Sequence, residues 1–583
     1  MTYQWNIRRL TAQEETLQQQ LQRELNISSA AARMLVVRDI QSAEEARQFI
    51  RPSLDKLHDP FLMKDMDKAV ERLHQALTQG EKILIYGDYD VDGTTAVAVM
   101  YRFLSPLASR IDYYIPDRYN EGYGVSTQGI DYAAEQGCTL IITLDCGIKA
   151  VEKVAYAKSK GIDIIVCDHH TPGDELPAAI AVLNMKRSDC PYPYKDLSGC
   201  GVGFKLAQAY TQRYLTNSEA SNSPSEASIL EPLLQLLAMS IASDIVPITG
   251  ENRILTHYGI KQINQAPFAG VSAVIAVAGI EDKKLTISDL VYKLGPRINA
   301  CGRMKSGRAA VELLLTDDAT FARQQAEEVN QHNEERRDCD TETTKEALAM
   351  LEEDATFAQR RSTVVYAPHW HKGVVGIVAS RLTETYYRPT IVLTAGEDGI
   401  ISGSARSVGG FDIYAAIDSC LDLLTNFGGH KYAAGLSMHI DNLPAFCERF
   451  EQYVATHIRE DQLQPTLLVE AELELADITP ALYNVIRYLE PFGPGNPRPL
   501  FVSRNLINHR DTRVVGKTGE HLRLDVTDRT YAITGIAFGR ADMAKHIQNG
   551  NPVDICYELD ENIFNNRTTI QMMVQDIKPC STN

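Results

Sequence analysis

The chain has 583 residues, which is too long for one hydrophobic core and predicts about three to four domains. Its net charge of −18 excludes a generally basic coat for nucleic acid, although a local basic groove is compatible with it, because steering depends on where the charges lie. The 11 cysteines show no paired CxxC spacing and therefore indicate reduced thiols in a cytoplasmic protein.

Residues 1–50 are polar and predict a peripheral helical segment without the apolar core of a secretory signal. No apolar run is long enough for a membrane helix, so we expect no membrane contact. Apolar strands and helices then alternate as far as about residue 185, which predicts a parallel sheet covered on both faces. The predicted strands are residues 82–86, 110–116, 138–145 and 162–168, and the predicted helices are residues 94–104 and 149–161.

Residues 216–228 form a polar loop rich in serine and asparagine, and an apolar helix follows it. From residue 308 to 367 the chain has no glycine or proline, and its charged pattern predicts a long, partly exposed helix that connects two lobes. A second α/β segment comes next. Residues 490–499 are dense in glycine and proline and predict a rigid linker or turn, and the short β-rich runs from 500 to 578 predict a small barrel.

Acidic side chains follow the predicted strands, at the edge where open α/β sheets place their sites. They are Asp88, Asp90 and Asp92 after the first strand, Asp145 after the third, Asp168 with His169 and His170 after the fourth, and Asp244 at the end of the apolar helix. Carboxylates that converge there would repel one another without a cation. Oxygen ligands with one or two imidazoles suit Mn²⁺ or Mg²⁺ better than zinc.

A single Asp-x-Asp in a strand-to-helix turn is more often a helix cap than a metal ligand. Acidic groups at successive strand ends, in chain order, favour the metal ligands. Two adjacent metals are the arrangement for in-line phosphoryl displacement, so the sequence predicts metal-assisted hydrolysis of a phosphoester or phosphoanhydride. Asp145 would bridge the two metals and His170 would contact the phosphate. Backbone amides at Gly93 and at the helix start near Thr94 would lie close to the anion.

The stretches "GDYDVDGTT", "TLDCGI", "CDHH" and "SDIVP" resemble, in order, the four acidic motifs of the DHH phosphoesterase superfamily. "GPRINACGRM" resembles the RecJ branch of that superfamily, and "HKGVVGIVASRL", "SGSARS" and "FGGHKYAAG" resemble its DHHA1 domain. The resemblance covers nearly the whole chain apart from the N-terminal segment and the 216–228 loop. It implies an α/β fold, in which a parallel-sheet DHH domain is joined by a long helix to a smaller α/β DHHA1 domain, with a C-terminal OB-like β-barrel. The implied parts are a helical segment (1–50), the DHH catalytic domain (51–315), the connector helix (316–360), the DHHA1 domain (361–460) and the OB-like nucleic-acid-binding domain (465–583).

The resemblance also implies roles for the clustered residues. Asp90 and Asp92 would bind different metals, with Asp88 either a third ligand or a close neighbour of the ligands. Asp145 would bridge the two ions. The remaining roles are His169 and Asp244 as the ligands that complete one site, Asp168 as the residue that orients the histidines, and His170 at the scissile phosphate.

Further donors are expected to bind phosphate. Arg297, Asn299 and Arg303 would present donors at a turn. Arg297 and Asn299 would be catalytic, and Arg303 would bind the substrate. The alternative is that an arginine here forms a structural ion pair. Ser404 and Arg406 are suited to hold the terminal 5′-phosphate.

Three other groups are candidate DNA contacts. Gly429 and His430 form an anion-friendly turn or a plain glycine turn, and Arg118 with Tyr123 would supply a guanidinium and a stacking ring at the entrance. In the barrel, the candidates are Arg513, Lys517 and Arg523, whereas Phe538 and Tyr557 could instead be core residues.

The function that the resemblance implies is a metal-dependent exonuclease that degrades single-stranded DNA from the 5′ end to 5′-mononucleotides, in DNA repair and recombination. It would use two Mn²⁺ or Mg²⁺ ions, act as a monomer, and work with a DNA helicase and a single-strand-binding protein. One alternative is a small-substrate DHH phosphodiesterase, which would not need the β-rich C-terminal domain. Another is a non-catalytic binding protein on the same scaffold, which would be expected to lose ligands that this chain retains.

Overall fold

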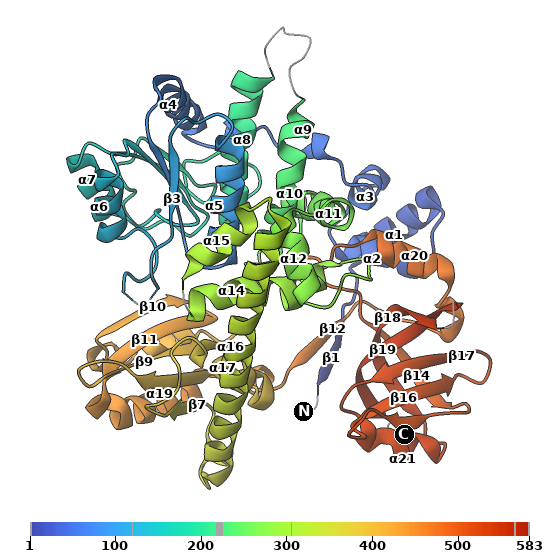
Figure 1. The fold of residues 1–583 in the computed structure, drawn as a ribbon. Coiled ribbons are helices and arrows are strands. Elements are labelled where there is room, and N and C mark those ends of the chain that lie inside the picture. Colours follow the sequence, from blue (N-terminus) through green and yellow to red (C-terminus); the bar gives the residue numbers. More distant parts are fainter. Residues whose placement is uncertain (1–2, 119, 217–224, 305, 565–566, 581–583) are drawn as a thin grey trace. The chain divides into compact units, whose positions relative to one another are not determined.

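The computed structural model describes residues 3–118, 120–216, 225–304, 306–564 and 567–580 (Figure 1). They divide into two compact units. The first unit comprises Pro52–Asp338 with Pro491–Pro497, and the second unit comprises Met1–Arg51, Cys339–Glu490 and Arg498–Asn583. The long helix α16 (Ala319–Glu353) supplies residues to both, as the predicted connector helix requires. Most of the predicted polar loop, residues 217–224, lies outside the described residues.

The first unit is built on a sheet of five parallel strands in the order β3-β2-β4-β5-β6, which confirms the predicted parallel sheet. The strands are β2 (Ile83–Gly87), β3 (Ile111–Tyr114), β4 (Leu140–Leu144), β5 (Asp163–Cys167) and β6 (Ala181–Leu183). The chain places β3 on one side of β2 and then crosses over to place β4, followed by β5 and β6, on the other side. The carboxyl ends of β2 and β4 therefore meet where the strand order reverses, which is where such sheets bind ligands.

Helices cover both faces of this sheet, because successive side chains of a buried strand point to opposite faces. Ile83 and Ile85 of β2 pack into one core, and Leu84 and Tyr86 pack into the other. The first core is shared with α4 (Met66–Gln79), α5 (Val91–Leu104) and α8 (Gly199–Tyr210), and the second with α6 (Thr127–Glu135) and α7 (Val151–Ser159). Figure 1 shows α6 and α7 on one side of the sheet and α5 and α8 on the other.

The rest of the first unit is helical. Its helices are α9 (Glu226–Leu230), α10 (Leu234–Ser243), α11 (Gly250–Gln265), α12 (Ala269–Val277), α13 (Ile287–Asp289), α14 (Gly295–Met304) and α15 (Gly307–Leu315). The apolar α10 packs against α5, so its C-terminal end at Asp244 is held beside the start of α5. No helix in the described part of the chain combines the length and the apolar composition needed to span a membrane.

The second unit contains a mixed sheet in the order β10-β11-β9-β8-β7, in which only β7 and β8 run parallel. Its strands are β7 (Thr363–Tyr366), β8 (Thr390–Ala395), β9 (Ile400–Arg406), β10 (Asn426–His430) and β11 (Ala433–His439). The helices beside it are α17 (Val375–Tyr386), α18 (Ile413–Asp418) and α19 (Leu443–His457). This is the smaller α/β domain that the sequence predicts.

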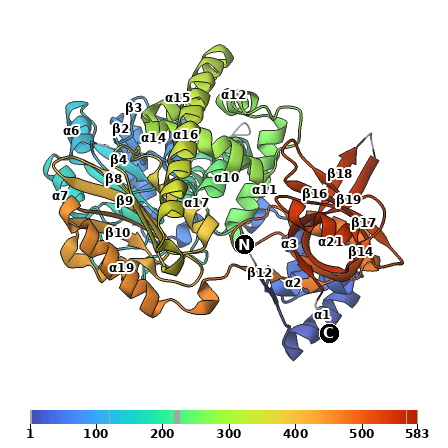
Figure 2. The ribbon, with the colours of Figure 1, turned by 90° about the horizontal axis from the view of Figure 1, so that it is seen from below.

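The C-terminal strands of the second unit form a closed ring. The pairing runs β14-β18-β19-β17-β16 and returns to β14, and Figure 2 looks onto this ring. Its strands are β14 (Phe501–Asn508), β16 (His521–Thr527), β17 (Ala532–Ala537), β18 (Val553–Phe564) and β19 (Arg567–Pro579). The strands β13 (Ala471–Glu472) and β15 (Arg513–Val515) add to it, and the helices nearby are α20 (Pro480–Tyr488) and α21 (Ala544–Gln548). The ring agrees with the predicted OB-like barrel.

The N-terminal segment is less simple than the predicted polar helical segment. Its first element is the strand β1 (Gln4–Ile7), which pairs in parallel with β12 (Thr466–Val469). The helices are α1 (Ala12–Leu25), α2 (Ser29–Val37) and α3 (Ala43–Ile50), and α2 buries Met34 and Leu35 completely. A strand as short as β1 obtains its hydrogen bonds from a distant segment, so nothing in the local sequence indicates it.

Candidate metal centre

The loop between β2 and α5 carries the first three aspartates. Asp90 is the N-cap of α5, and its carboxylate accepts a hydrogen bond from the Gly93 amide at 3.1 Å. A Cβ at Gly93 would lie 2.4 Å from the carbonyl oxygen of Asp88, so only glycine lets the helix begin this close to the loop. Asp90 is thus both a cap and a candidate ligand, and the two interpretations of the Asp-x-Asp motif do not exclude each other.

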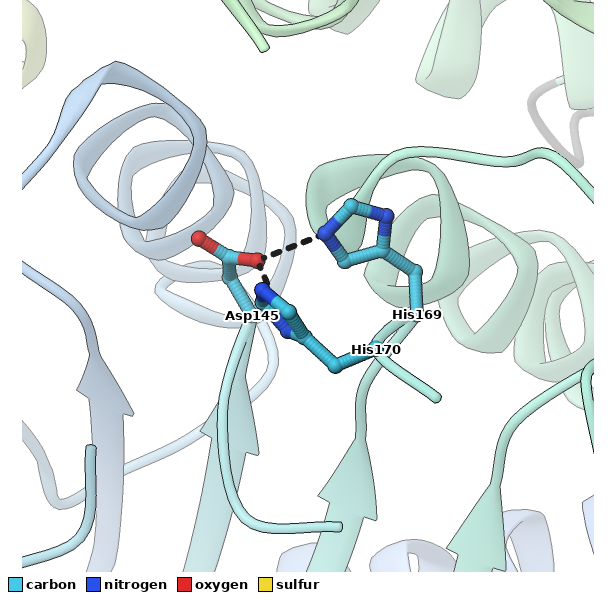
Figure 3. A group of neighbouring side chains, drawn as sticks. All are labelled: Asp145, His169 and His170. Carbon is cyan, nitrogen blue, oxygen red and sulfur yellow. Dashed lines mark ion pairs between the residues drawn. The ribbon is translucent and has the colours of Figure 1, made fainter. Parts of the chain in front are cut away.

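The structure brings all the predicted metal ligands together, in groups whose candidate ligand atoms lie within 4.8 Å of one another. The groups are Asp88, Asp90 and Asp145; Asp92, His169 and Asp244; and Asp145, His169 and His170. Asp145 and His169 therefore belong to more than one group. In Figure 3 both imidazoles turn toward the Asp145 carboxylate, with Asp145 Oδ1 at 3.2 Å from His169 Nε2 and 3.9 Å from His170 Nδ1.

Burial and mutual repulsion make this cluster costly without a counter-charge. Burial and the neighbouring Asp92 carboxylate raise the pKa of Asp145 well above its usual range. Burial and Asp90 do the same to the pKa of Asp88, and burial and Asp92 to that of Asp244. Burial lowers the pKa of His169, which favours the neutral imidazole that binds metals.

Several buried ligand atoms have no hydrogen-bond partner among the described residues, although buried polar atoms are normally paired. They are Asp88 Oδ1, Asp145 Oδ1, Asp244 Oδ2 and both ring nitrogens of His169. Divalent cations would satisfy these atoms and neutralise the carboxylates. The oxygen-rich donor set with one imidazole fits Mn²⁺ or Mg²⁺, and the shared position of Asp145 fits a pair of ions.

Asp92 is held by donors that the sequence did not reveal. Its carboxylate accepts hydrogen bonds from the amides of Gly199 (2.7 Å) and Cys200 (2.8 Å) at the start of α8, and from the Ser240 hydroxyl (2.7 Å) in α10. A Cβ at Gly199 would lie 2.5 Å from Asp145 Cβ, so this glycine also allows α8 to approach the cluster. The only sequence signal is the glycine-rich helix start "SGCGVGF" at residues 198–204, which does not identify its acceptor.

Asp168 orients one of the two histidines directly. Its Oδ1 accepts hydrogen bonds from the His170 amide (3.0 Å) and from His170 Nδ1 (2.8 Å), and its Oδ2 accepts from the Ile148 amide (2.8 Å). Burial would raise the pKa of Asp168, but these hydrogen bonds outweigh burial and lower it. Asp168 therefore stays ionised and fixes the His170 ring.

The two predicted entrance residues have different neighbours. The Tyr123 hydroxyl lies 3.2 Å from the ring nitrogens of His170 and donates to the Asp145 carbonyl at 3.1 Å, so it reaches the cluster itself. The Arg118 guanidinium lies over the Tyr89 ring, 5.1 Å from its centroid. Tyr123 thus lies beside Asp145 and His170 of the cluster, and its predicted contact with DNA stays a prediction.

The prediction that "GPRINACGRM" forms a turn is wrong, because residues 295–304 form helix α14. The chain is helical without a break from Ile287 to Met304, and the π-helical turn at Leu290–Leu294 comes just before Pro296. Arg297 donates to Asn330 Oδ1 (2.9 Å) and to the Lys293 carbonyl (2.7 Å), which are contacts of a structural arginine. Arg303 lies on the same helix.

Helix α14 packs against the aspartate loop, which is the segment between β2 and α5 that carries Asp88, Asp90 and Asp92. Asn299 Oδ1 accepts a hydrogen bond from the Val91 amide at 3.1 Å. A Cβ at Gly302 would lie 2.4 Å from the Tyr89 carbonyl oxygen. These contacts link Asn299 to the backbone of the aspartate loop, and the predicted contacts of Arg297, Asn299 and Arg303 with substrate stay predictions.

The remaining predicted substrate residues belong to the second unit. Arg406 Nη1 donates to Ser404 Oγ at 2.7 Å, and the two side chains lie on β9 beside Gly376. Among the described residues no carboxylate forms an ion pair with Arg406, so its guanidinium is available to an anion. Gly429 and His430 lie on β10, where Gly429 has a φ of 149° and a Cβ there would lie 2.4 Å from the Ala433 carbonyl oxygen.

Family models match three parts of the chain. They are the DHH family N-terminal domain at residues 82–241, the DHHA1 domain at residues 361–456 and the RecJ OB domain at residues 469–576. The single-stranded-DNA-specific exonuclease RecJ of Escherichia coli (strain K12) is 34% identical, over 94% of this chain and 95% of its own length. The protein of that name from Bacillus subtilis (strain 168) is 35% identical, over 95% of this chain and 69% of its own length.

Solved structures of related proteins carry the metals that the cluster fits. The crystal structure of RecJ from Thermus thermophilus in complex with Mn²⁺ has a TM-score of 0.84 and 26% identity, and covers 100% of this chain and 80% of that one. The structure of the same protein with Mg²⁺ has a TM-score of 0.78 and 25% identity, and covers 99% of this chain and 79% of that one.

Proposed function

Because the chain belongs to the RecJ family of single-stranded-DNA-specific exonucleases, we propose that it hydrolyses the phosphodiester bonds of single-stranded DNA with Mn²⁺ or Mg²⁺. The observation that carries the proposal is the cluster of buried, unpartnered carboxylate and imidazole atoms at the strand ends. A non-catalytic scaffold would have no need to keep such a costly group of atoms.

We assign the ligands to two ions. Asp88, Asp90 and Asp145 would hold one, and Asp92, His169 and Asp244 would hold the other, with Asp145 between them. When bound, the ions stabilise the charge on the attacking and leaving oxygens of an in-line displacement. Asp168 fixes the His170 ring through Nδ1, and Nε2 of His170, which lies 3.2 Å from the Tyr123 hydroxyl, would contact an oxygen of the scissile phosphate beside that hydroxyl.

The direction of digestion would be set in the second unit. Arg406 has a half-buried guanidinium, a neighbouring hydroxyl on Ser404 and no described carboxylate partner. Burial lowers the pKa of Arg406, so the cation is poorly solvated and an anion would stabilise it. A terminal 5′-phosphate fits this pair of donors, and binding it would start digestion at the 5′ end and release 5′-mononucleotides.

The test is the digestion of two single-stranded oligonucleotides, one labelled at the 5′ end and one at the 3′ end. With Mn²⁺ or Mg²⁺, we expect the 5′ label to appear at once as a mononucleotide and the 3′-labelled strand to shorten progressively. Chelator, Asp90→Ala and His169→Ala should each stop both reactions. Survival of long strands while dinucleotides are cut would favour a small-substrate phosphodiesterase, and metal-independent binding without turnover would favour a binding protein.

Phe538 is one of the exposed aromatic rings of the barrel and is suited to stack on DNA bases. Phe538 is 60% exposed and lies edge-on to His521, whereas Tyr557 is fully buried and bonded to Ser503. Base stacking on an aromatic side chain contributes about 1–3 kcal/mol, so Phe538→Ala should weaken the binding of single-stranded DNA by that amount. Fluorescence anisotropy with a labelled oligonucleotide measures the change. Phe538→Tyr keeps the ring and should bind as the wild type does; equal affinity of all three proteins would remove Phe538 from the interface.

The wider role that we propose follows from this activity. An enzyme confined to single strands needs a DNA helicase to supply them and meets them coated with a single-strand-binding protein. We propose that it acts with both partners in DNA repair and recombination, as a cytoplasmic monomer.

A further inference from the structure

The turn formed by Pro491–Pro497 packs within the first unit, although the chain on both sides of it belongs to the second. Gly493 and Asn496 exchange two backbone hydrogen bonds, of 2.9 and 3.0 Å. The buried Asn496 side chain donates to the Pro491 carbonyl at 2.8 Å and so closes the turn. A segment that is closed in this way has a fixed shape and can hold another loop in place.

The loop that this turn contacts is the one that leaves Asp244. Residues 244–249 connect α10 to α11, and the Ile248 amide donates to the Pro494 carbonyl at 2.6 Å. The contact is close, because a Cβ at Gly493 would lie 2.5 Å from Ile248 Cγ1 and a Cβ at Gly495 would lie 2.9 Å from Thr249 Cγ2. The 491–497 turn therefore fixes this loop at Ile248, four residues after the candidate metal ligand Asp244.

The loop needs such support because it begins with an unfavourable backbone. Ile245, the residue after Asp244, has a φ of 59° and is 69% exposed. A positive φ is costly for a β-branched side chain and persists only where the surroundings impose it. The exposed Ile245 side chain offers little packing, so the restraint comes from Ile248, which is buried, and from Pro247, whose carbonyl accepts from Tyr194 (3.2 Å).

We infer that the 491–497 turn is a positioning element for Asp244. It holds Ile248, which keeps the chain reversed at Ile245 and aims the Asp244 carboxylate at His169, where Oδ2 lies 3.6 Å from Nε2. This inference rests on the proposed metal site. It assigns a role to the glycine- and proline-rich stretch, for which a rigid linker or turn is the expectation from sequence alone.

The test measures Mn²⁺ binding directly, by the electron paramagnetic resonance signal of free Mn²⁺ in a titration. Gly493→Ala puts a methyl group against Ile248 and should weaken one Mn²⁺ site by about 10- to 100-fold, the usual effect of losing support behind a ligand. Ile248→Ala in the same chain removes the clashing Cγ1 and should restore much of the affinity. Asp244→Ala should weaken the same site, and adding Gly493→Ala to it should change nothing more.

A second pair of variants guards against misfolding. Gly495 (φ 74°) and Gly550 (φ 79°) have similar backbones, but a Cβ at Gly550 meets nothing within 4 Å. Gly495→Ala should weaken Mn²⁺ binding, and Gly550→Ala should not. Wild-type affinity in both Gly493→Ala and Gly495→Ala, or full additivity with Asp244→Ala, would overturn the inference. A wild-type protein that binds no Mn²⁺ would overturn the proposed function and this inference with it.

Discussion

Asp145→Asn should reduce kcat on single-stranded DNA by at least about 1,000-fold. The substitution removes the carboxylate that two ions would share, and with it several kcal/mol of transition-state stabilisation. Each 1.36 kcal/mol of lost stabilisation lowers the rate about tenfold. Asparagine is the right replacement, since Asp145 has a φ of 60°, a conformation that asparagine adopts readily. Single-turnover digestion at saturating Mn²⁺, together with the Mn²⁺ stoichiometry, gives both the rate and the number of bound ions.

A matched control lies in the same unit. Asp131 on α6 pairs with Lys160 at the surface, at 3.0 Å, and accepts from Tyr156. Asp131→Asn removes a carboxylate of the same size from a position outside the cluster and should leave kcat unchanged. If Asp145→Asn kept a tenth or more of the wild-type rate with two ions bound, the bridging role of Asp145 would be wrong.

Lys205→Met should lower the stability of the first unit by about 3–5 kcal/mol, the usual cost of leaving one member of a buried ion pair without its partner. Lys205 Nζ lies 2.7 Å from Glu251 Oε1, and both side chains are at most 1% exposed. Methionine fills nearly the same volume, so the loss is electrostatic rather than a cavity. The Glu251 carboxylate would keep only the Tyr192 hydroxyl (2.6 Å) and the His58 amide (2.9 Å) as donors among the described residues.

Hydrogen exchange of the α8 and α11 amides reports this loss locally, which matters because a chain with two units need not unfold in one step. The control is Asp67→Ala, which breaks the exposed pair of Asp67 with Arg213 and should cost about 0–1 kcal/mol. Equal losses in the two variants would mean that burial does not set the strength of the Lys205–Glu251 pair.

The cluster of candidate ligands could be predicted from sequence because its signals are local. Each acidic group follows an apolar strand or helix, and parallel strands bring their carboxyl ends to one edge. The sequence could not show that Asp145 and His169 would be shared among the groups, since this depends on how β4 and β5 are twisted and on the backbone at Asp145.

The hydrogen bonds that hold the candidate ligands in place could not be predicted. The donors to Asp92 come from α8 and α10, and a hydrogen bond between segments more than 100 residues apart leaves no local pattern. Helix α14 shows the opposite case, in which a local pattern misleads. A turn is the expectation for Arg297, Asn299 and Arg303, but Gly302 is needed where the helix meets the Tyr89 backbone, and this close packing offsets the roughly 1 kcal/mol that glycine costs inside a helix.

The pairing of β1 with β12 has a consequence for the order in which the chain can fold. Gln4 precedes its partner Thr466 by 462 residues (466 − 4). At about 5–20 residues per second, the first strand waits on the order of 20–90 s for its partner. The five-stranded parallel sheet of the first unit is complete well before then. The strand β1 must therefore remain unpaired while the segments between it and β12 are made and fold.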